Sequence, residues 1–208
     1  MKKLLVILTA LAFVLCFSTI SFAGIVGTAH DLSGEGWNTT SEICVVCHTP
    51  HNASTVTDAP LWNHTVTSAT FTPYPDTGTL DATVGQPAGV SLLCLSCHDG
   101  TVGIDAFGDN TPVPTMITGD ALLGTDLSND HPISFTYDAA LATADGELFD
   151  PTTTSSGLGG NIDVDMLFGA GNDQLQCASC HDVHNDTNNP FLRKANTNSA
   201  LCLTCHDK

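Results

Sequence analysis

Basic residues are scarce in this chain of 208 residues, which has 5 Lys and Arg against 22 Asp and Glu and a formal charge of −17. A chain with this charge repels phosphate backbones, which excludes nucleic acid as a partner. Aromatic residues are also few, at 6% of the chain. Because the large side chains that usually fill a protein core are scarce, we expect something other than side chains to occupy the interior.

The first 23 residues have the pattern of a secretory signal peptide. Lys2 and Lys3 precede an apolar run over residues 4–20, and Ser21-Phe22-Ala23 offers small residues at the cleavage positions. A membrane anchor is the alternative, but the run is at the lower limit of the ~17–25 residues that span a bilayer, and no basic flank follows it. We expect cleavage after Ala23, which leaves residues 24–208 with three basic residues, a charge of −19 and no membrane span.

The other eight cysteines form four C-x-x-C-H motifs. The motif cysteines are Cys44, Cys47, Cys94, Cys97, Cys177, Cys180, Cys202 and Cys205, and the histidines that follow are His48, His98, His181 and His206. An even number of cysteines in an exported protein is typical of disulfides, and two C-x-x-C pairs can bind zinc. Neither alternative explains why a histidine follows every pair. C-x-x-C-H is the attachment signature of c-type haem, so we predict four covalently bound haem c groups.

The spacing of the motif suits this chemistry. Two thiols three residues apart lie on one side of a helical turn, where they can reach the two vinyl groups on one edge of a porphyrin. The next residue brings its imidazole to the iron as the proximal ligand. We therefore expect the four motif histidines to bind iron.

Five further histidines are candidates for the distal iron position: His30, His51, His64, His131 and His184. Five imidazoles for four irons predict bis-histidine coordination and leave one histidine surplus. His51 and His184 each follow a proximal histidine by three residues, which is too close to reach the opposite face of the same iron. We expect these two to bind a neighbouring haem.

The motifs repeat in pairs. CVVCHTPHN (44–52) resembles CASCHDVHN (177–185), and SLLCLSCHDG (91–100) resembles SALCLTCHDK (199–208). The sequence thus predicts one domain over residues 24–208 that is built from two duplicated two-haem units, approximately 24–110 and 111–208. The repeat pairs His30 with His131, which makes His64 surplus. The likeness of Asn63-His64-Thr65 to Asp130-His131-Pro132 argues the other way, so both assignments stay open.

The sequence also lacks long segments with the hydrophobic period of an amphipathic helix. The stretches between the motifs are dominated by Thr, Gly, Asp, Asn and Pro. The predicted fold is a mostly irregular, loop-rich multihaem cytochrome whose core is formed by stacked haems. Short helices are expected at the motifs, over residues 41–48, 91–98, 174–181 and 198–206. A few short strands are expected, with residues 68–74 and 133–137 as candidates.

The sequence segments around the motifs resemble those of a known family. Residues 45–52, 60–64, 94–102 and 130–135 are similar to secreted multihaem c-type cytochromes of metal-reducing bacteria, in particular to the tetrahaem, filament-forming OmcE-like group. The resemblance covers most of the chain after residue 23. It implies stacked bis-histidine haems, extracellular respiration and polymerisation into a cytochrome nanowire. It also implies that His51 resembles the ligand that filament-forming relatives donate to the next subunit.

Three functions compete at this point. The first is an extracellular or cell-surface electron conductor, a head-to-tail homopolymer that passes electrons between redox partner cytochromes and external acceptors such as metal oxides. The second is a soluble periplasmic electron shuttle. The third is a multihaem reductase, which needs an open iron and positive residues for an anionic substrate. The scarcity of basic residues and the surplus of histidines disfavour the reductase, so we expect an electron-transfer protein without catalytic residues.

Overall fold

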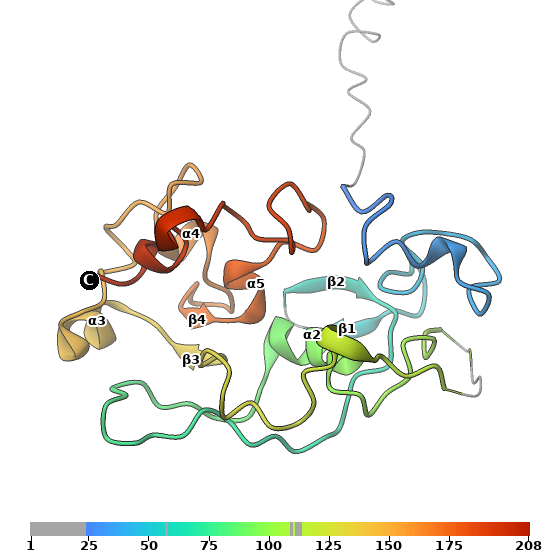
Figure 1. The fold of residues 1–208 in the computed structure, drawn as a ribbon, viewed down its shortest axis with the longest axis horizontal. Helices are drawn as coiled ribbons and strands as arrows, with labels where there is room; N and C mark the ends of the chain where they lie inside the picture. Colours follow the sequence, from blue (N-terminus) through green and yellow to red (C-terminus); the bar gives the residue numbers. More distant parts are fainter. Residues whose placement is uncertain (1–23, 57, 109, 111–113) are drawn as a thin grey trace, which may run out of the picture.

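Short elements joined by irregular chain make up this protein, as Figure 1 shows. The computed structural model describes residues 24–208 apart from 57, 109 and 111–113. The signal peptide expected at residues 1–23 lies outside this described part. Within it, no helix has the length and apolar character needed to cross a membrane. The loop-rich fold class expected from the sequence is confirmed.

The elements are few and brief. In chain order they are η1 (Leu32–Gly34), β1 (Ser54–Val56), β2 (Ala59–Trp62), α2 (Gly89–His98), η2 (Gly119–Ala121), β3 (Phe135–Thr136), α3 (Ala139–Asp145), α4 (Ile162–Asp165), β4 (Gln174–Leu175), α5 (Cys177–Cys180), η3 (Thr197–Ser199) and η4 (Cys202–Thr204). Strand β1 pairs with β2, and β3 pairs with β4, both antiparallel. These two ribbons are too small to form a core by themselves.

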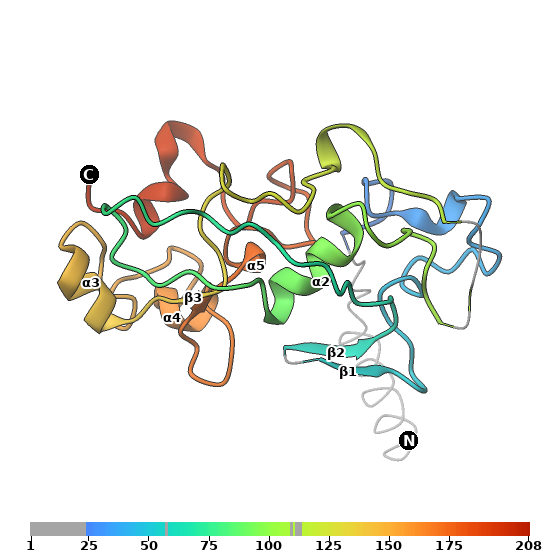
Figure 2. The same cartoon turned by 90° about the horizontal axis from the view of Figure 1, so that it is seen from below.

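Two halves lie side by side along the long axis of the molecule. The first half holds the β1–β2 ribbon and α2, and the second holds α3, α4, α5 and the β3–β4 ribbon (Figure 1). A long irregular segment between β2 and α2 runs from the first half along the second (Figure 2). There Ala82 and Val84 pack against the hydrophobic cluster of the second half. The halves are therefore interlocked.

The hydrophobic core is small and divided. One cluster of eight buried residues lies in the second half around Tyr137, Ile162 and Met166. The hydroxyl group of Tyr137 donates a hydrogen bond to the carbonyl oxygen of Phe149, which satisfies this buried polar atom. A second cluster has only three buried members, Phe71, Leu95 and Leu127.

Only some of the local predictions hold. Helix α2 matches the helix expected over residues 91–98, but residues 41–48 form turns, and Ser41 has a positive φ of 55°. The helix expected over 174–181 is reduced to α5, because residues 174–175 pair with β3 instead. The C-terminal motif forms the 3-10 helix η4. The strand expected over 68–74 is wrong, since this stretch makes one isolated bridge, from Thr72 to Asp126, whereas 133–137 does contain β3.

Candidate haem sites

Each of the four motifs adopts one helical turn, even where no longer helix forms. The histidine N–H donates to the carbonyl oxygen of the first cysteine at 2.8 Å in the first motif, 3.1 Å in the third and 3.1 Å in the fourth, while α2 spans the second motif. This turn places the two thiols and the imidazole close together, as haem attachment requires. All eight motif cysteines carry free thiols, so the structure forms none of the disulfides that their even number allows.

Three of the motif histidines are held by a backbone carbonyl. Nδ1 lies 3.0 Å from the oxygen of Pro60 for His48, 2.7 Å from that of Ala121 for His98, and 3.0 Å from that of Pro190 for His181. An Nδ1–H that donates to a carbonyl fixes the tautomer and leaves the Nε2 lone pair for a metal. The backbone thus orients these imidazoles as metal ligands.

Three motif histidines also face a histidine from elsewhere in the chain. The ring centroids are 6.1 Å apart for His98 and His30, 6.2 Å for His48 and His184, and 6.2 Å for His206 and His131. Two imidazoles that bind one metal from opposite sides through bonds of about 2 Å have their centroids roughly 6 Å apart. Burial lowers the pKa of His30 and His206, which favours the neutral form that binds metals. The three pairs therefore have the spacing of axial ligands.

His51 and His181 have no such counterpart within the described residues. Both side chains are exposed. His181 is oriented by Pro190 like the other motif histidines, yet no ring of the described chain faces it. The fold thus leaves one motif histidine and one further histidine at the surface.

His64 is placed differently from all the others. Its side chain is 1% exposed. Nδ1 lies 2.8 Å from the carbonyl oxygen of Thr65, and Nε2 lies 3.0 Å from that of Gly103. Nε2 is also 3.5 Å from the sulfur of Cys97. Because both ring nitrogens face protein atoms, the geometry favours a structural role for His64 beside the second motif.

Thiols of successive motifs affect one another's pKa in the order of the sequence. The thiol of Cys94 is hydrogen-bonded to that of Cys177, which raises the pKa of Cys94 and lowers the pKa of Cys177. Burial raises the pKa of Cys97 to about 12, with Cys47 as the next cause. Burial likewise raises the pKa of Cys205 to about 11, with Cys180 as the next cause. The first site therefore adjoins the second, the second the third, and the third the fourth.

A buried glutamine that the motif analysis missed joins the second and third sites. The side-chain oxygen of Gln176 accepts hydrogen bonds from the backbone N–H of Ser91 in α2 and from the hydroxyl group of Ser134. In return, the N–H of Cys177 donates to the Ser91 hydroxyl group at 2.9 Å. These bonds fix α2 against α5. The only sequence signal was a polar residue directly before a motif cysteine, which is too general to single out Gln176.

Several buried nitrogens lack a partner among the described residues. They are Nδ1 of His30 and the indole nitrogens of Trp37 and Trp62. The Trp62 ring lies 6.4 Å from the ring of His48 and 6.4 Å from that of His64. Since a buried unpaired donor is costly, these nitrogens fit a bound group that carries acceptor oxygens, as the propionates of haem do. The thiols, imidazoles and unpaired donors are together suited to haem c.

Comparison with known proteins agrees with this donor set. Residues 170–208, which contain the third and fourth motifs, match the family described as the doubled CXXCH motif. No curated protein matches the chain. The matched segment supports a multihaem c-type cytochrome. The CXXCH motifs indicate covalently bound haem c and a protein of electron transfer rather than a classical enzyme.

Proposed function

We propose that this protein binds four haem c groups and conducts electrons along them. The observation that carries the proposal is the ring spacing: three of the four motif histidines face a histidine from a distant part of the chain at 6.1–6.2 Å. The hydrogen bond between the Cys94 and Cys177 thiols, and the effects of Cys47 on the pKa of Cys97 and of Cys180 on that of Cys205, support a row of four neighbouring sites. Bound haem supplies a one-electron couple, and the chain attaches it, binds its iron and holds adjacent groups close.

The same geometry disfavours the reductase at three of the four sites. Where a motif histidine faces a second histidine, at the first, second and fourth sites, a bound iron would have an imidazole on each side and no position for a substrate. The three basic side chains of the described part are also already engaged. Arg193 donates to the carbonyl oxygen of Ala178, and Lys194 donates to that of Ser156. Lys208 pairs with Glu147. An oxyanion would therefore meet an acidic surface with no cation left to hold it.

We place this conductor outside the cell, as a head-to-tail polymer in which His51 binds a haem iron of the next copy. The signal-peptide pattern supports export, and the exposed, unpaired ring of His51 in the described part supports a contact between copies. A contact between two different surfaces propagates into a filament unless it closes into a ring. Such a filament would link redox partner cytochromes to external acceptors such as metal oxides. Electron microscopy of the culture medium tests this location and assembly.

The haem count is tested by mass spectrometry of the secreted protein. We expect the mass of residues 24–208 plus four haems, and no thiol that reacts with an alkylating reagent, because every motif cysteine becomes a thioether. The same mass also tests the predicted cleavage of the signal peptide after Ala23. A mass that corresponds to disulfides or bound zinc would contradict the proposal.

The angles between facing rings predict two kinds of ferric signal. The ring planes meet at 17° for His48 and His184, but at 86° for His98 and His30 and at 70° for His206 and His131. Nearly parallel axial imidazoles split the iron d orbitals and give a rhombic low-spin spectrum, whereas nearly perpendicular ones give a strongly anisotropic signal. Electron paramagnetic resonance of the oxidised protein should resolve both kinds. Four identical rhombic signals would be incompatible with these ring pairs.

A further inference from the structure

Two consecutive basic residues lie beside the third and fourth sites. The sequence contains no lysine or arginine between Lys3 and Arg193, and Lys194 follows directly. The side chains of Arg193 and Lys194 are both half-buried. Salt screens charges in such positions less than charges at the surface. Each cation therefore acts on a nearby redox group more strongly than an exposed charge at the same distance would.

Arg193 is bonded to the third motif. Its backbone N–H donates to the carbonyl oxygen of Cys180 at 2.9 Å, and its Nε–H donates to that of Ala178, which stands between the two motif cysteines. The guanidinium lies 5.7 Å from the centre of the Phe168 ring, a distance at which a cation and an aromatic face attract. Burial raises the pKa of the Cys180 thiol, and Arg193 opposes this rise. The structure thus holds Arg193 within electrostatic reach of the third site.

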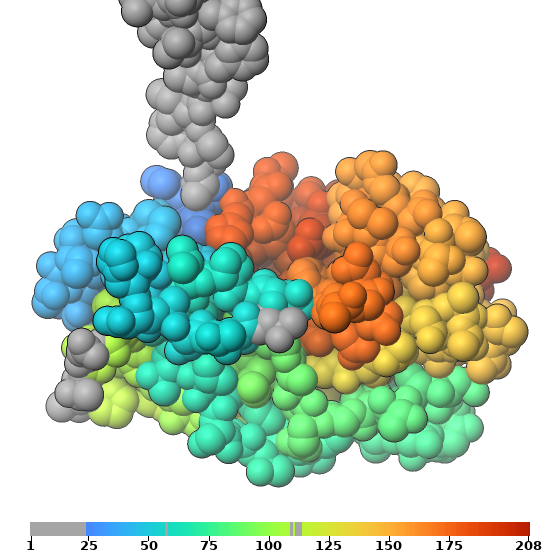
Figure 3. Space-filling model, turned by 180° about the vertical axis from the view of Figure 1, so that it is seen from behind, coloured from blue at the N-terminus to red at the C-terminus, as the bar shows by residue number. Residues whose placement is uncertain are grey.

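Lys194 makes the equivalent contact with the fourth motif. Its Nζ donates to the hydroxyl group of Thr204, which stands between the two motif cysteines, at 3.0 Å, and to the carbonyl oxygen of Ser156 at 2.9 Å. Gly157 has a φ of 75°, and a Cβ there would lie 3.0 Å from Nζ, so this glycine leaves room for the ammonium group. The chain that includes this loop and α4 forms part of the outer surface of the second half, in orange in Figure 3. Burial raises the pKa of the Cys205 thiol to about 11, and Lys194 opposes this rise. Lys194 therefore lies between a surface loop and the fourth site.

The first and second sites have carboxylates beside them instead. Asp99, which directly follows the second motif, is 4% exposed, and its carboxylate accepts hydrogen bonds from Thr67 and Thr101. At the first site, a carboxylate oxygen of Asp182 lies 3.7 Å from Nδ1 of His184, the imidazole that faces the first motif histidine. Residues 24–110 contain no lysine or arginine. Fixed charge of opposite sign thus adjoins the sites of the two halves.

We propose that Arg193 and Lys194 raise the reduction potentials of the third and fourth haems, so that the second half of the chain takes up electrons before the first half. This rests on the proposed function and adds a direction to the row of sites. One electron that reduces a ferric iron to a ferrous one lowers the charge of the site by one unit, so a fixed cation nearby favours the reduced form. A buried carboxylate favours the oxidised form for the same reason. The step in potential falls between the second and third sites, where α2 meets α5.

The order of reduction in the wild type is the first test. The first site, whose facing rings of His48 and His184 have planes 17° apart, gives the rhombic ferric signal. The secreted four-haem protein is reduced stepwise and followed by electron paramagnetic resonance and visible absorption. We expect two of the four haems to be reduced before the rhombic signal decreases. Loss of this signal before half of the haem absorbance has changed would overturn the step between the halves.

Substitution of each cation separates its charge from the acidic residues that the second half also contains. We expect Arg193→Gln and Lys194→Gln each to lower one of the four midpoint potentials, while the midpoint of the rhombic signal stays unchanged. Arg193→Lys and Lys194→Arg keep the charge and should keep the wild-type potentials, whereas a role that depends on the exact hydrogen bonds would be lost in them too. Lys208→Gln is the matched control. It removes the same charge from an exposed side chain that is paired with Glu147, and should leave all four potentials unchanged.

The outcomes separate this inference from the proposed function. Wild-type potentials in both glutamine variants, or an equal fall in the two charge-keeping variants, would overturn the role of the two cations while four-haem electron conduction stands. A secreted chain that carries no haem would overturn both. If a glutamine variant does not accumulate with four haems, the order of reduction in the wild type decides.

Discussion

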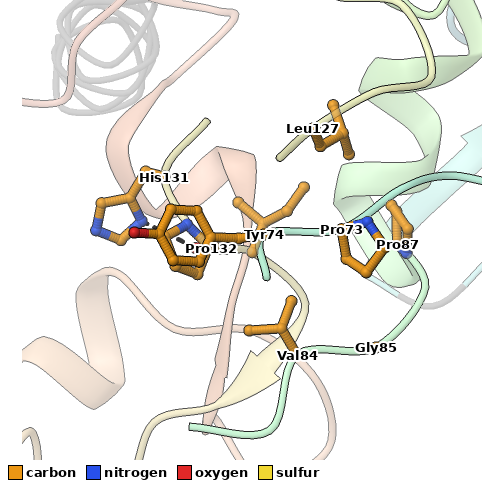
Figure 4. A pocket seen from close by; sticks show the side chains of 9 residues that line it. Pro73, Tyr74, Val84, Gly85, Pro87, Leu127, His131 and Pro132 are labelled. Carbon is orange, nitrogen blue, oxygen red and sulfur yellow. Dashed lines mark hydrogen bonds between the residues drawn. The ribbon is translucent and has the colours of Figure 1, made fainter. Parts of the chain in front are cut away.

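Replacing His131 with alanine should turn one of the bound haems from low-spin to high-spin. The His131 ring faces that of His206 at 6.2 Å, and its Nδ1 lies 2.9 Å from the carbonyl oxygen of Pro132, which leaves Nε2 free for the iron. Figure 4 shows His131 at a small pocket whose lining includes Tyr74 and Val84. The packed, largely apolar lining offers no second imidazole to replace the lost one. A high-spin absorption band in the oxidised protein, and binding of carbon monoxide to the reduced protein, measure the change.

His64→Ala is the contrasting substitution and should leave all haems low-spin. Its cost should appear in stability, since the buried ring lies within hydrogen-bond distance of the carbonyl oxygens of Thr65 and Gly103, and a neutral imidazole donates to one of them. Loss of this hydrogen bond and the resulting cavity should lower the free energy of unfolding by about 2–4 kcal/mol. Thermal unfolding of the haem-loaded protein gives this difference. A high-spin haem in His64→Ala would instead show that His64 is a ligand and would overturn our assignment.

Protein made without haem attachment should fail to fold cooperatively, which is the largest effect on stability that we expect. The hydrophobic clusters have eight and three buried members, and the longest helix in the described part is α2, with 10 residues. Helices this short are marginal without tertiary packing, and a small apolar core does not offset the chain entropy lost on folding. A haem held by thioethers stays attached to the unfolded chain, so it stabilises the fold through the apolar burial and the distal imidazole bond that only the folded chain provides.

Production of residues 24–208 in the cytoplasm, where no haem is attached, provides the material for this experiment. Far-ultraviolet circular dichroism and amide hydrogen exchange should then show little persistent structure, in contrast to the haem-loaded protein as control. A sharp, cooperative thermal transition in the haem-free chain would mean that the two clusters suffice, and that haem is not the main part of the core.

Local features of the chain were predictable where the chemistry itself is local. A thioether pair and an adjacent imidazole need residues at fixed short spacing, so the four motifs could be found without a structure, and each does form a helical turn. The loop-rich fold class could be predicted because the sequence lacks long segments with a helical hydrophobic period. The expected helix over 41–48 and the expected strand over 68–74 did not form, because neighbouring segments rather than local propensity decide such short stretches.

The sequence by itself determined the number of motifs, their duplication and the set of nine histidines, because these depend only on spacing along the chain. The tertiary structure decided which histidines face one another. His30 and His98 are 68 positions apart by their numbers, and His48 and His184 come from different halves, so their encounter depends on packing between remote segments. The same packing buries His64 and exposes His51. No spacing rule separates these two, since burial is a property of the folded surface.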